Sequence, residues 1–484
     1  MSFRRVVAQR LWASLVAGCL LLAPAARLAA DEKREPLTLD EVVSSITRQY
    51  PPLLASLIER DIASGRLQSA GGAFDLNLFA KLFGTPAGYY QSGTVDVGVE
   101  QFTGLWGSTI FGGYRITRGE ELPDYYSNRT LGGGEPRFGL NIPLLRDGAI
   151  DRRRAALLKA EIDRDLVDPT IARQRLDFIR AGTLAYFNWL AAGRRWELAE
   201  DLLRVANERA AGLVKQVETG LVPRIVLTDN QRLVVAREIG VVQARRRFEG
   251  AALSLALFYR TANDDEPVVV GRERLPQGFP DALVPAPARV ELDIDQALTA
   301  RPELRRLQLA LDKLEVDRSL ARNQLQPNVD VGVLLSQDFG EKLYDDRRDF
   351  EVQAGIEIKL PLQRREAKGR LAEVEAQIGQ GLNEQRFTRD RIRTEVRDAF
   401  SAIIAASEQI RLAQLNAALA VELREAEEER FRRGASDLLA LQLREQAAFD
   451  AQTLAVEAYA EHFRALADYR AAVAVDLVRG PSGS

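Results

Sequence analysis

The stretch RFGLNIPL at residues 137–144 returns in altered form as AGIEIKLPL at residues 354–362. In both stretches apolar and polar residues alternate before a Pro-Leu pair, and a period of two predicts a β-strand with one apolar face. A basic cluster follows each stretch, Arg152–Arg154 in the first case and Arg364–Arg365 in the second. The return of strand, proline and basic cluster indicates two related units in one chain.

Other features recur around these strands in the same order. The matching segments are 39–43 with 294–298, 50–53 with 301–304, 74–78 with 328–333, and the glycine-containing segments 219–223 with 433–437. One match is weak evidence, whereas five in one order predict an internal duplication. We expect a first structural repeat at 37–258, a linker with little regular structure at 259–289 apart from Val268–Val270, a second repeat at 290–475, and a disordered tail at 476–484.

The strands are expected in two regions, about 73–144 and about 327–362, with two to four strands in the first and two in the second. Residues 84–136 are rich in Gly and aromatic side chains, which suits the girdles of a membrane barrel and equally suits ordinary strands with glycine turns. Segment 93–117 fits either a further hairpin or an external loop. Because the smallest membrane barrels have about eight strands, a barrel would require several chains to pool theirs.

Long amphipathic helices are predicted in both repeats, from 150 to 218 and from about 383 to 432, with return helices at 225–259 and 438–475. We expect Asp168-Pro169 to interrupt the first, and Gly379-Gln380-Gly381 to weaken the second at a similar level. About 65 helical residues span roughly 100 Å. The narrow apolar stripes are typical of coiled coils, and we expect their charge runs to face solvent.

The composition argues against most chemistry. The 484 residues include one His, one Cys and one Met, with a net charge of −3. A metal site of His, Cys and Met ligands needs three or four of them, and a His-dependent hydrolase would rest on His462 alone. We expect His462 to serve packing or to lie on a helix surface. The sequence therefore predicts no enzyme, no cofactor and no metal site, and the balanced charge predicts no nucleic-acid partner.

Residues 1–30 have the parts of a secretory signal peptide, with Arg4, Arg5 and Arg10 before a short apolar run and small residues at the end. The apolar run at 11–22 is too short for a comfortable membrane span. Ordinary cleavage near Ala23–Ala30 is the favoured reading. The alternative is a lipoprotein signal, in which Val16-Ala17-Gly18-Cys19 would make Cys19 a lipidated first residue.

The ordered duplication of helix starts, strands ending in Pro-Leu and glycine turns resembles the TolC family of outer-membrane efflux channels over about 37–475. The resemblance implies a mainly α fold with a membrane β-barrel portion. Duplicated helix–strand–strand–helix halves would form a trimeric α-barrel and a shared β-barrel. It further implies the channel component of a tripartite efflux or type I secretion system, a passive exit duct in the outer membrane of a Gram-negative bacterium that extends into the periplasm. The implied partners are two further copies, outer-membrane lipid, a periplasmic adaptor protein and an inner-membrane transporter.

The resemblance also assigns a role to the two glycine turns, which would be the periplasmic tips that meet the adaptor. The residues that take this role are Gly220, Leu221, Val222 and Pro223, and Gly434, Ala435, Ser436 and Asp437. The acidic constriction of some family members does not transfer, because its positions hold Ala440 and Leu443. A competing interpretation is a periplasmic coiled-coil adaptor or scaffold protein without a channel.

Overall fold

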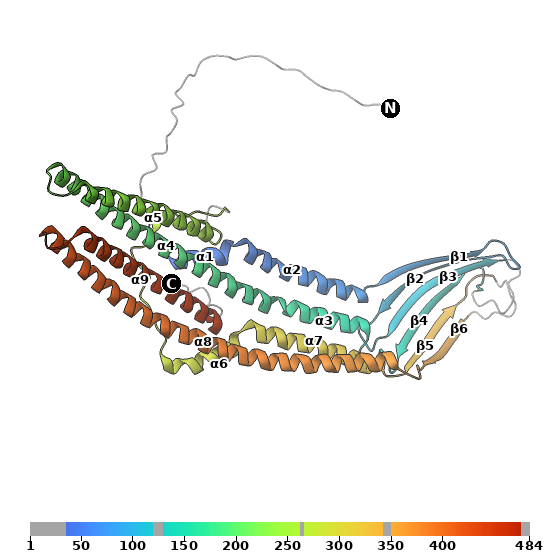
Figure 1. The fold of residues 1–484 in the computed structure, drawn as a ribbon. Coiled ribbons are helices and arrows are strands. Elements are labelled where there is room, and N and C mark those ends of the chain that lie inside the picture. Colours follow the sequence, from blue (N-terminus) through green and yellow to red (C-terminus); the bar gives the residue numbers. More distant parts are fainter. Residues whose placement is uncertain (1–34, 120–128, 262–265, 342–349, 476–484) are drawn as a thin grey trace, which may run out of the picture.

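A six-stranded antiparallel sheet forms one end of an elongated molecule, and long helices form the rest (Figure 1). The structure is a computed structural model that describes residues 35–119, 129–261, 266–341 and 350–475. The expected signal peptide at 1–30, the candidate lipidation site Cys19 and the expected tail at 476–484 lie outside the described residues. In the described part, no helix is both long enough and apolar enough to cross a membrane.

Before the linker, the chain forms a block of helices, then a block of strands, and then a second block of helices. They are α1 (Leu39–Gln49), α2 (Pro51–Gly71), the short 3₁₀ turn η1 (Gly72–Phe74), β1 (Asn77–Thr85), β2 (Ser92–Phe102), β3 (Thr109–Gly119), β4 (Glu135–Pro143), α3 (Arg152–Asp165), α4 (Val167–Glu218) and α5 (Arg224–Ala256). Segment 93–117 thus falls on β2 and β3, which pair with each other as a hairpin.

The remaining elements follow a similar order with fewer strands. They are the 3₁₀ turns η2 (Arg272–Arg274) and η3 (Pro287–Arg289), then α6 (Val290–Ala300), α7 (Pro302–Gln324), β5 (Asn328–Gln337), β6 (Phe350–Lys359), α8 (Arg365–Arg432) and α9 (Leu438–Val473). The quoted stretches 137–144 and 354–362 lie on β4 and β6, and both strands pair with β5, Ile142 opposite Val331 and Val331 opposite Ile356.

Several helices begin where the sequence supplies a capping group. Thr38 and Glu41 form a reciprocal capping box at the start of α1, and the Asp151 carboxylate accepts the N–H groups of Arg153 and Arg154 at the start of α3. Pro51 and Pro302 occupy the first position of α2 and α7, where a missing N–H costs nothing.

The interruption predicted in the first long helix and the weak point predicted in the second have different outcomes. The first is confirmed, because Leu166 separates α3 from α4 and Pro169 lies in the first turn of α4. At the second position, where the sequence predicts a weakened helix, α8 continues unbroken through Gly379 and Gly381 for 68 residues. A Cβ on Gly381 would lie 2.7 Å from the Leu311 side chain of α7. Gly381 therefore gives α7 room to approach α8, and a helix held by such packing absorbs the modest glycine penalty.

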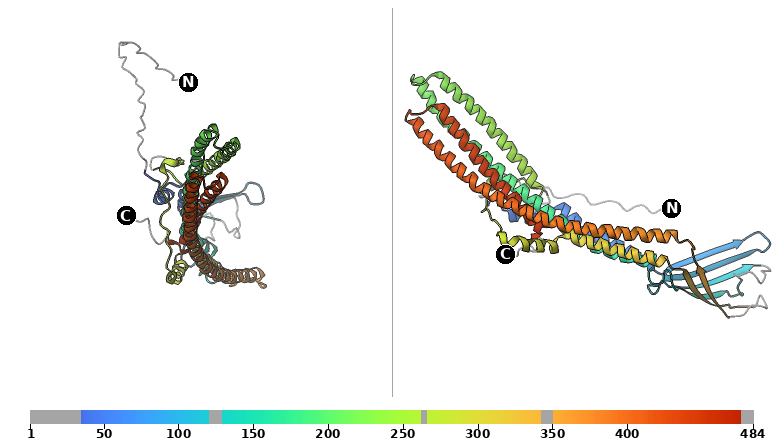
Figure 2. Two further views of the ribbon diagram at one scale, coloured as in Figure 1. Left: turned by 60° about the vertical axis from the view of Figure 1, so that its left-hand side comes forward. Right: turned by 60° about the horizontal axis from the view of Figure 1, so that its bottom comes forward.

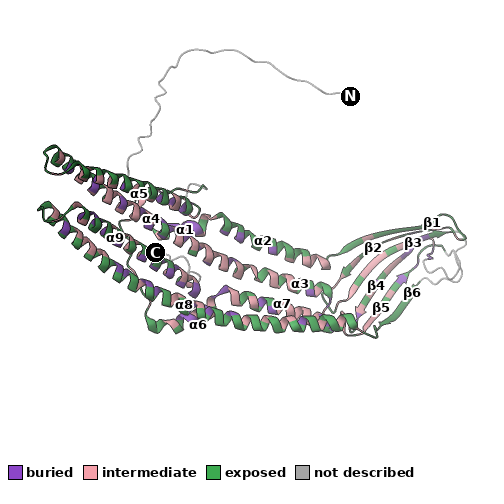
Figure 3. Cartoon of the chain, in the orientation of Figure 1, coloured by how far each residue is buried: buried purple, intermediate pink, exposed green. Residues whose placement is uncertain are grey.

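Two helical hairpins, α4–α5 and α8–α9, run side by side away from the sheet (Figures 1 and 2). The main apolar core lies where α1, α4, α5 and α9 meet, around the fully buried Trp189. Phe187 of α4 stacks on Phe463 of α9 with ring centroids 4.2 Å apart. Burial follows the inner faces of the hairpins, while their outer faces stay exposed (Figure 3).

The described residues of the expected linker form the 3₁₀ turns η2 and η3, and several of them pack into this core. Val270 is buried, Phe279 stacks on Tyr459, and the Leu275 side chain fills the space above Gly193 of α4. Val268–Val270 forms no strand. The linker therefore packs across α4 and α9. Its Pro-rich composition does not predict this packing.

Candidate functional site at the hairpin tips and the sheet

The first glycine turn joins α4 to α5 at the end of the molecule opposite the sheet (Figure 1). Gly220 has a φ of +73°, in the left-handed region that favours glycine. Its N–H donates to the Val217 carbonyl at 3.1 Å, and the N–H of Leu221 donates to the Gln216 carbonyl at 2.8 Å. This pair of bonds is a Schellman motif, which satisfies the last carbonyls of α4 and reverses the chain before Pro223.

The second turn, between α8 and α9, repeats this geometry. Gly434 also has a φ of +73°, its N–H donates to Phe431 at 3.0 Å, and the N–H of Ala435 donates to Arg430 at 2.8 Å. The Asp437 carboxylate then caps α9 by accepting the N–H of Ala440 at 2.7 Å. Asp437 is thus engaged in helix capping, and the Ser436 hydroxyl donates to Glu427.

The structure brings all eight predicted tip residues to one end of the molecule, on two matching turns. A Cβ on Gly220 or Gly434 would meet no atom within 4 Å, so only the positive φ requires glycine there. Large apolar side chains stand exposed beside the turns, with Leu221 75% and Leu439 62% accessible. Such a surface offers apolar contact to another protein.

A buried ionic cluster lies behind the tips and joins three helices. Glu445 of α9 pairs with Arg209 of α4 and, at 2.7 Å, with Arg237 of α5. All three side chains are at most 9% exposed. Arg237 also donates to the Leu202 carbonyl at 2.9 Å. Burial, and secondly the charge of Arg209, lowers the pKa of Arg237 to about 10.

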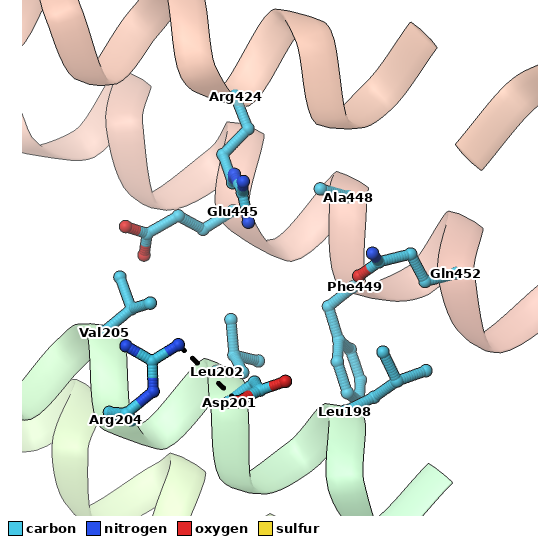
Figure 4. Close-up of a pocket in the computed structure, with 10 residues that line it drawn as sticks. All are labelled: Leu198, Asp201, Leu202, Arg204, Val205, Arg424, Glu445, Ala448, Phe449 and Gln452. Carbon is cyan, nitrogen blue, oxygen red and sulfur yellow. Dashed lines mark ion pairs between the residues drawn. The ribbon is translucent and has the colours of Figure 1, made fainter. Parts of the chain in front are cut away.

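Sequence reasoning missed this cluster, because a charge on a helix has the same spacing whether it faces solvent or a neighbouring helix. Beside it, a cavity of about 130 Å³ lies between α4 and the α8–α9 hairpin, with Arg204, Arg424 and Glu445 among its lining residues (Figure 4). The cavity is small and mixed in character, so we assign it no ligand.

The sheet has two chemically distinct faces, and the strand register defines them. Val97 of β2 lies opposite Tyr114 of β3, Phe138 opposite Leu335, and Val331 opposite Ile356. These and most of their equivalents on the same face are apolar, and many are exposed, including Leu78, Val97 and Ile356. We call this the apolar face.

The opposite face is largely polar and carries ion pairs between strands. Arg115 pairs with Glu135 at 2.8 Å, and Arg137 pairs with Asp96 at 2.5 Å. We call this the polar face. An apolar face that is exposed over much of a sheet is a mark of contact with lipid or protein, because its contact with water is unfavourable.

Comparisons with known proteins find the same architecture in solved structures only. No family model and no curated protein matches the chain. The open state of the MtrE outer membrane channel of Neisseria gonorrhoeae is similar, with 16% identity, a TM-score of 0.64, and 90% of this chain and 88% of that chain covered. The outer membrane protein VceC of Vibrio cholerae is similar at 16% identity and a TM-score of 0.63, with 90% of this chain and 95% of that chain covered. The Campylobacter jejuni CmeC outer membrane channel is similar at 14% identity and a TM-score of 0.62, with 90% of this chain and 85% of that chain covered.

The chain has the outer-membrane channel fold. At the level of fold, this confirms the resemblance to the TolC family, with a mainly helical chain and a six-stranded antiparallel sheet. The CmeC and MtrE structures are both described as outer membrane channels. In this chain the glycine turns and the sheet lie at opposite ends of the long helices (Figure 1).

Proposed function

We propose that this chain is the outer-membrane channel of a tripartite efflux or type I secretion system. It would act as a passive exit duct across the outer membrane and the periplasm of a Gram-negative bacterium. The observation that carries the proposal is the channel fold, which extends over 90% of the chain and places an exposed apolar sheet opposite the hairpin tips. A duct makes and breaks no bonds, which agrees with the scarcity of His and Cys.

We propose a homotrimer, because one chain cannot close a barrel. The sheet order runs from β1 to β6, so each of these two strands has a single neighbour within the described chain. An open edge cannot face lipid, since each unpaired N–H and C=O there costs several kcal/mol. Pairing β6 of one copy with β1 of the next would remove every edge, with the apolar face toward lipid and the polar face toward the lumen.

The helices would form the second part of the duct. We propose that the segments 37–258 and 290–475 are duplicated units, because each runs from two short helices through strands to a long hairpin. The hairpins of three copies would then close a helical barrel through the periplasm. The exposed apolar residues on the outer faces of α5 and α8, such as Val242 and Leu419, are available for contact between copies.

The two tips would dock a periplasmic adaptor protein, which in turn would connect to an inner-membrane transporter. The support is the matched geometry of the turns and their exposed apolar side chains. Export through the signal at 1–30, with cleavage or with lipidation of Cys19, remains a prediction from the sequence.

Assembly can be tested on the purified protein. We expect the protein to require detergent for extraction from membranes and to migrate as a heat-sensitive trimer in native and mildly denaturing gels. A soluble periplasmic monomer would overturn the proposal and would favour the scaffold interpretation.

The tips can be tested by Gly220→Val and Gly434→Val. A β-branched residue at positive φ costs about 1–2 kcal/mol, enough to distort the turn without disturbing the distant sheet. We expect the trimer to assemble and export to be lost. Gly212→Val is the matched control, because Gly212 also has no atom within 4 Å of its Cβ position but lies inside α4. Normal export by both tip variants would refute the docking assignment.

A further inference from the structure

The long helices of the two hairpins form a row in the order α5, α4, α9 and α8. Helix α4 contacts both α5 and α9, and α9 contacts α8, so α5 and α8 are the outer helices of the row (Figure 1). Yet α8 carries large apolar side chains on its exposed surface, at spacings of three and four residues. These are Leu412, Leu415, Leu419 and Leu423, each 49–52% exposed, and we call them the leucine stripe. Such spacing is typical of a coiled-coil seam, and the described chain leaves this seam uncovered.

The two glycine turns define which residues of the hairpins are equivalent. Gly220 and Gly434 have the same φ and matching hydrogen bonds, and the difference between 434 and 220 is 214. Helices α4 and α8 lead into these turns, and α5 and α9 lead out of them. An offset of 214 residues therefore relates α4 to α8 and α5 to α9. It places the leucine stripe at the positions that Leu198, Asp201, Val205 and Arg209 occupy on α4.

On α4 these positions face α9. Leu198 and Val205 line the cavity opposite Phe449 and Glu445 of α9 (Figure 4). Arg209 reaches the Glu445 carboxylate in an ion pair. The leucine stripe is therefore the side of α8 that, in the other repeat, packs against a neighbouring helix.

The matching side of α5 is exposed as well. Gln231 and Val235 are the equivalents of Glu445 and Phe449, and both are exposed, Val235 by 54%. The same side of α5 continues in the exposed residue Val242, two turns further along. The two outer helices thus present, on opposite edges of the row, the two sides that pack together as α4 and α9 inside it.

The inner and outer sides differ in charge. In the described chain, three ion pairs join α4 to α9, namely Arg180 with Asp468, Arg195 with Glu457, and Arg209 with Glu445. At the equivalent positions of α8 and α5 all six residues are uncharged and exposed, namely Thr394 and Ser254, Gln409 and Gln243, and Leu423 and Gln231. Every charge that joins α4 to α9 is thus replaced by a neutral side chain on the outer helices.

This difference indicates both a partner for the outer helices and the means of selecting it. The step rests on the proposed homotrimer. We propose that the leucine stripe of α8 docks on the Val235 side of α5 from the next copy, in the register that α4 and α9 use within the chain. If α5 of another copy took the place of α9 against α4, Arg209 would be buried opposite the uncharged Gln231, without a carboxylate. A buried charge without a partner is strongly unfavourable, so the ion pairs reserve α4 for α9 and leave α5 to α8.

Cross-linking of the membrane-embedded protein tests the register. Leu423→Cys combined with Gln231→Cys occupies the positions equivalent to Arg209 and Glu445, and a short bis-maleimide should link one copy to the next, seen as dimers and trimers on denaturing gels. Leu423→Cys with Arg245→Cys is the matched control, because Arg245 is also exposed on α5 but lies 14 residues, or about 21 Å, from Gln231. The chain without an introduced cysteine gives the background from Cys19.

The outcomes separate the register from the proposed function. If the unchanged chain forms a trimer but the first pair links no better than the control pair, the register is refuted. If the unchanged chain forms no trimer, the proposed function fails and this inference fails with it.

A charge placed between copies tests the selection. Leu423→Arg sets a charge against the neutral Gln231, and we expect the trimer to dissociate at a lower temperature when samples are heated before electrophoresis. Adding Gln231→Glu recreates the ion pair found inside the chain and should restore that temperature. Leu454→Arg is the matched control, because Leu454 is 50% exposed but lies on α9, between α4 and α8. An unchanged temperature in Leu423→Arg, no recovery with Gln231→Glu, or an equal fall in the control would each overturn the proposal.

Discussion

Removing the Glu445 carboxylate should loosen the contact between the two helical hairpins. In Glu445→Ala, Arg209 and Arg237 would keep their charges in a buried site, with side chains 9% and 4% exposed and no carboxylate between them. Breaking a buried ion pair by removing one partner costs about 3–5 kcal/mol, because the remaining charge is neither hydrated nor neutralised. Since about 1.4 kcal/mol is a factor of ten, opening of α9 from α4 and α5 should increase by about two to four orders of magnitude.

Hydrogen exchange and limited trypsin cleavage of the detergent-solubilised protein would measure this opening. When opening is fast relative to cleavage, the cleavage rate follows the population of the open form. We expect faster exchange in α9 near residue 445 and new cleavage after Arg209 and Arg237. Glu457→Ala is the control, because Glu457 also pairs across to α4, with Arg195 at 3.1 Å, but is half exposed and should contribute at most about 1 kcal/mol.

The same cluster allows a second test. Replacing all three residues by apolar side chains of similar size should restore much of the stability lost in Glu445→Ala, because no buried charge is then left unpaired. Unchanged protection in Glu445→Ala would refute the assignment of the cluster as a link between the hairpins. A triple variant as open as Glu445→Ala would refute the electrostatic explanation.

Three further outcomes are expected. Burial lowers the pKa of His462, whose side chain has 0% exposure, so below about pH 6.5 the unfolded chain binds a proton that the folded chain does not. The free energy of unfolding should therefore fall as the pH drops below about 6.5. Urea unfolding at pH 7 and pH 5 should show a smaller fall for His462→Phe than for the unchanged chain. Gly381→Leu should lower the melting temperature by driving a side chain into Leu311, whereas Gly379→Leu, at a position with open space, should not. Asp437→Ala removes the N-cap of α9 and should cost about 1 kcal/mol, seen as faster exchange in the first turn of α9.

Much of the fold could be predicted because local patterns determined it. Alternation over 137–144 and 354–362 is satisfied by β4 and β6, and Gly220 and Gly434 both adopt the left-handed conformation that a tight helix reversal needs. Each of these signals lies within a few neighbouring residues. A single sequence is sufficient to read them.

The remaining features depend on contacts between distant residues. Gly381 is predicted from the sequence to weaken its helix, and only the approach of Leu311 from another helix explains why a glycine lies there. Glu445 looked like one more solvated charge, and only the approach of α4 and α5 to α9 reveals its partners. Leu275 and Phe279 lie in the Pro-rich linker, and its local sequence does not predict their contacts with Gly193 and Tyr459. No local pattern encodes these approaches.

The row of six strands with β1 and β6 at its ends constrains how the protein is made. A single sheet would bring two unpaired ladders of N–H and C=O groups into hydrocarbon, so it cannot enter lipid alone. If the sheet enters the outer membrane as proposed, insertion must coincide with association, and its rate must rise steeply with the concentration of newly exported chains. A chain that has not yet associated would expose unpaired edge strands, which can pair with other chains and aggregate. Efficient biogenesis would then require chaperones that bind such chains, or their prompt degradation.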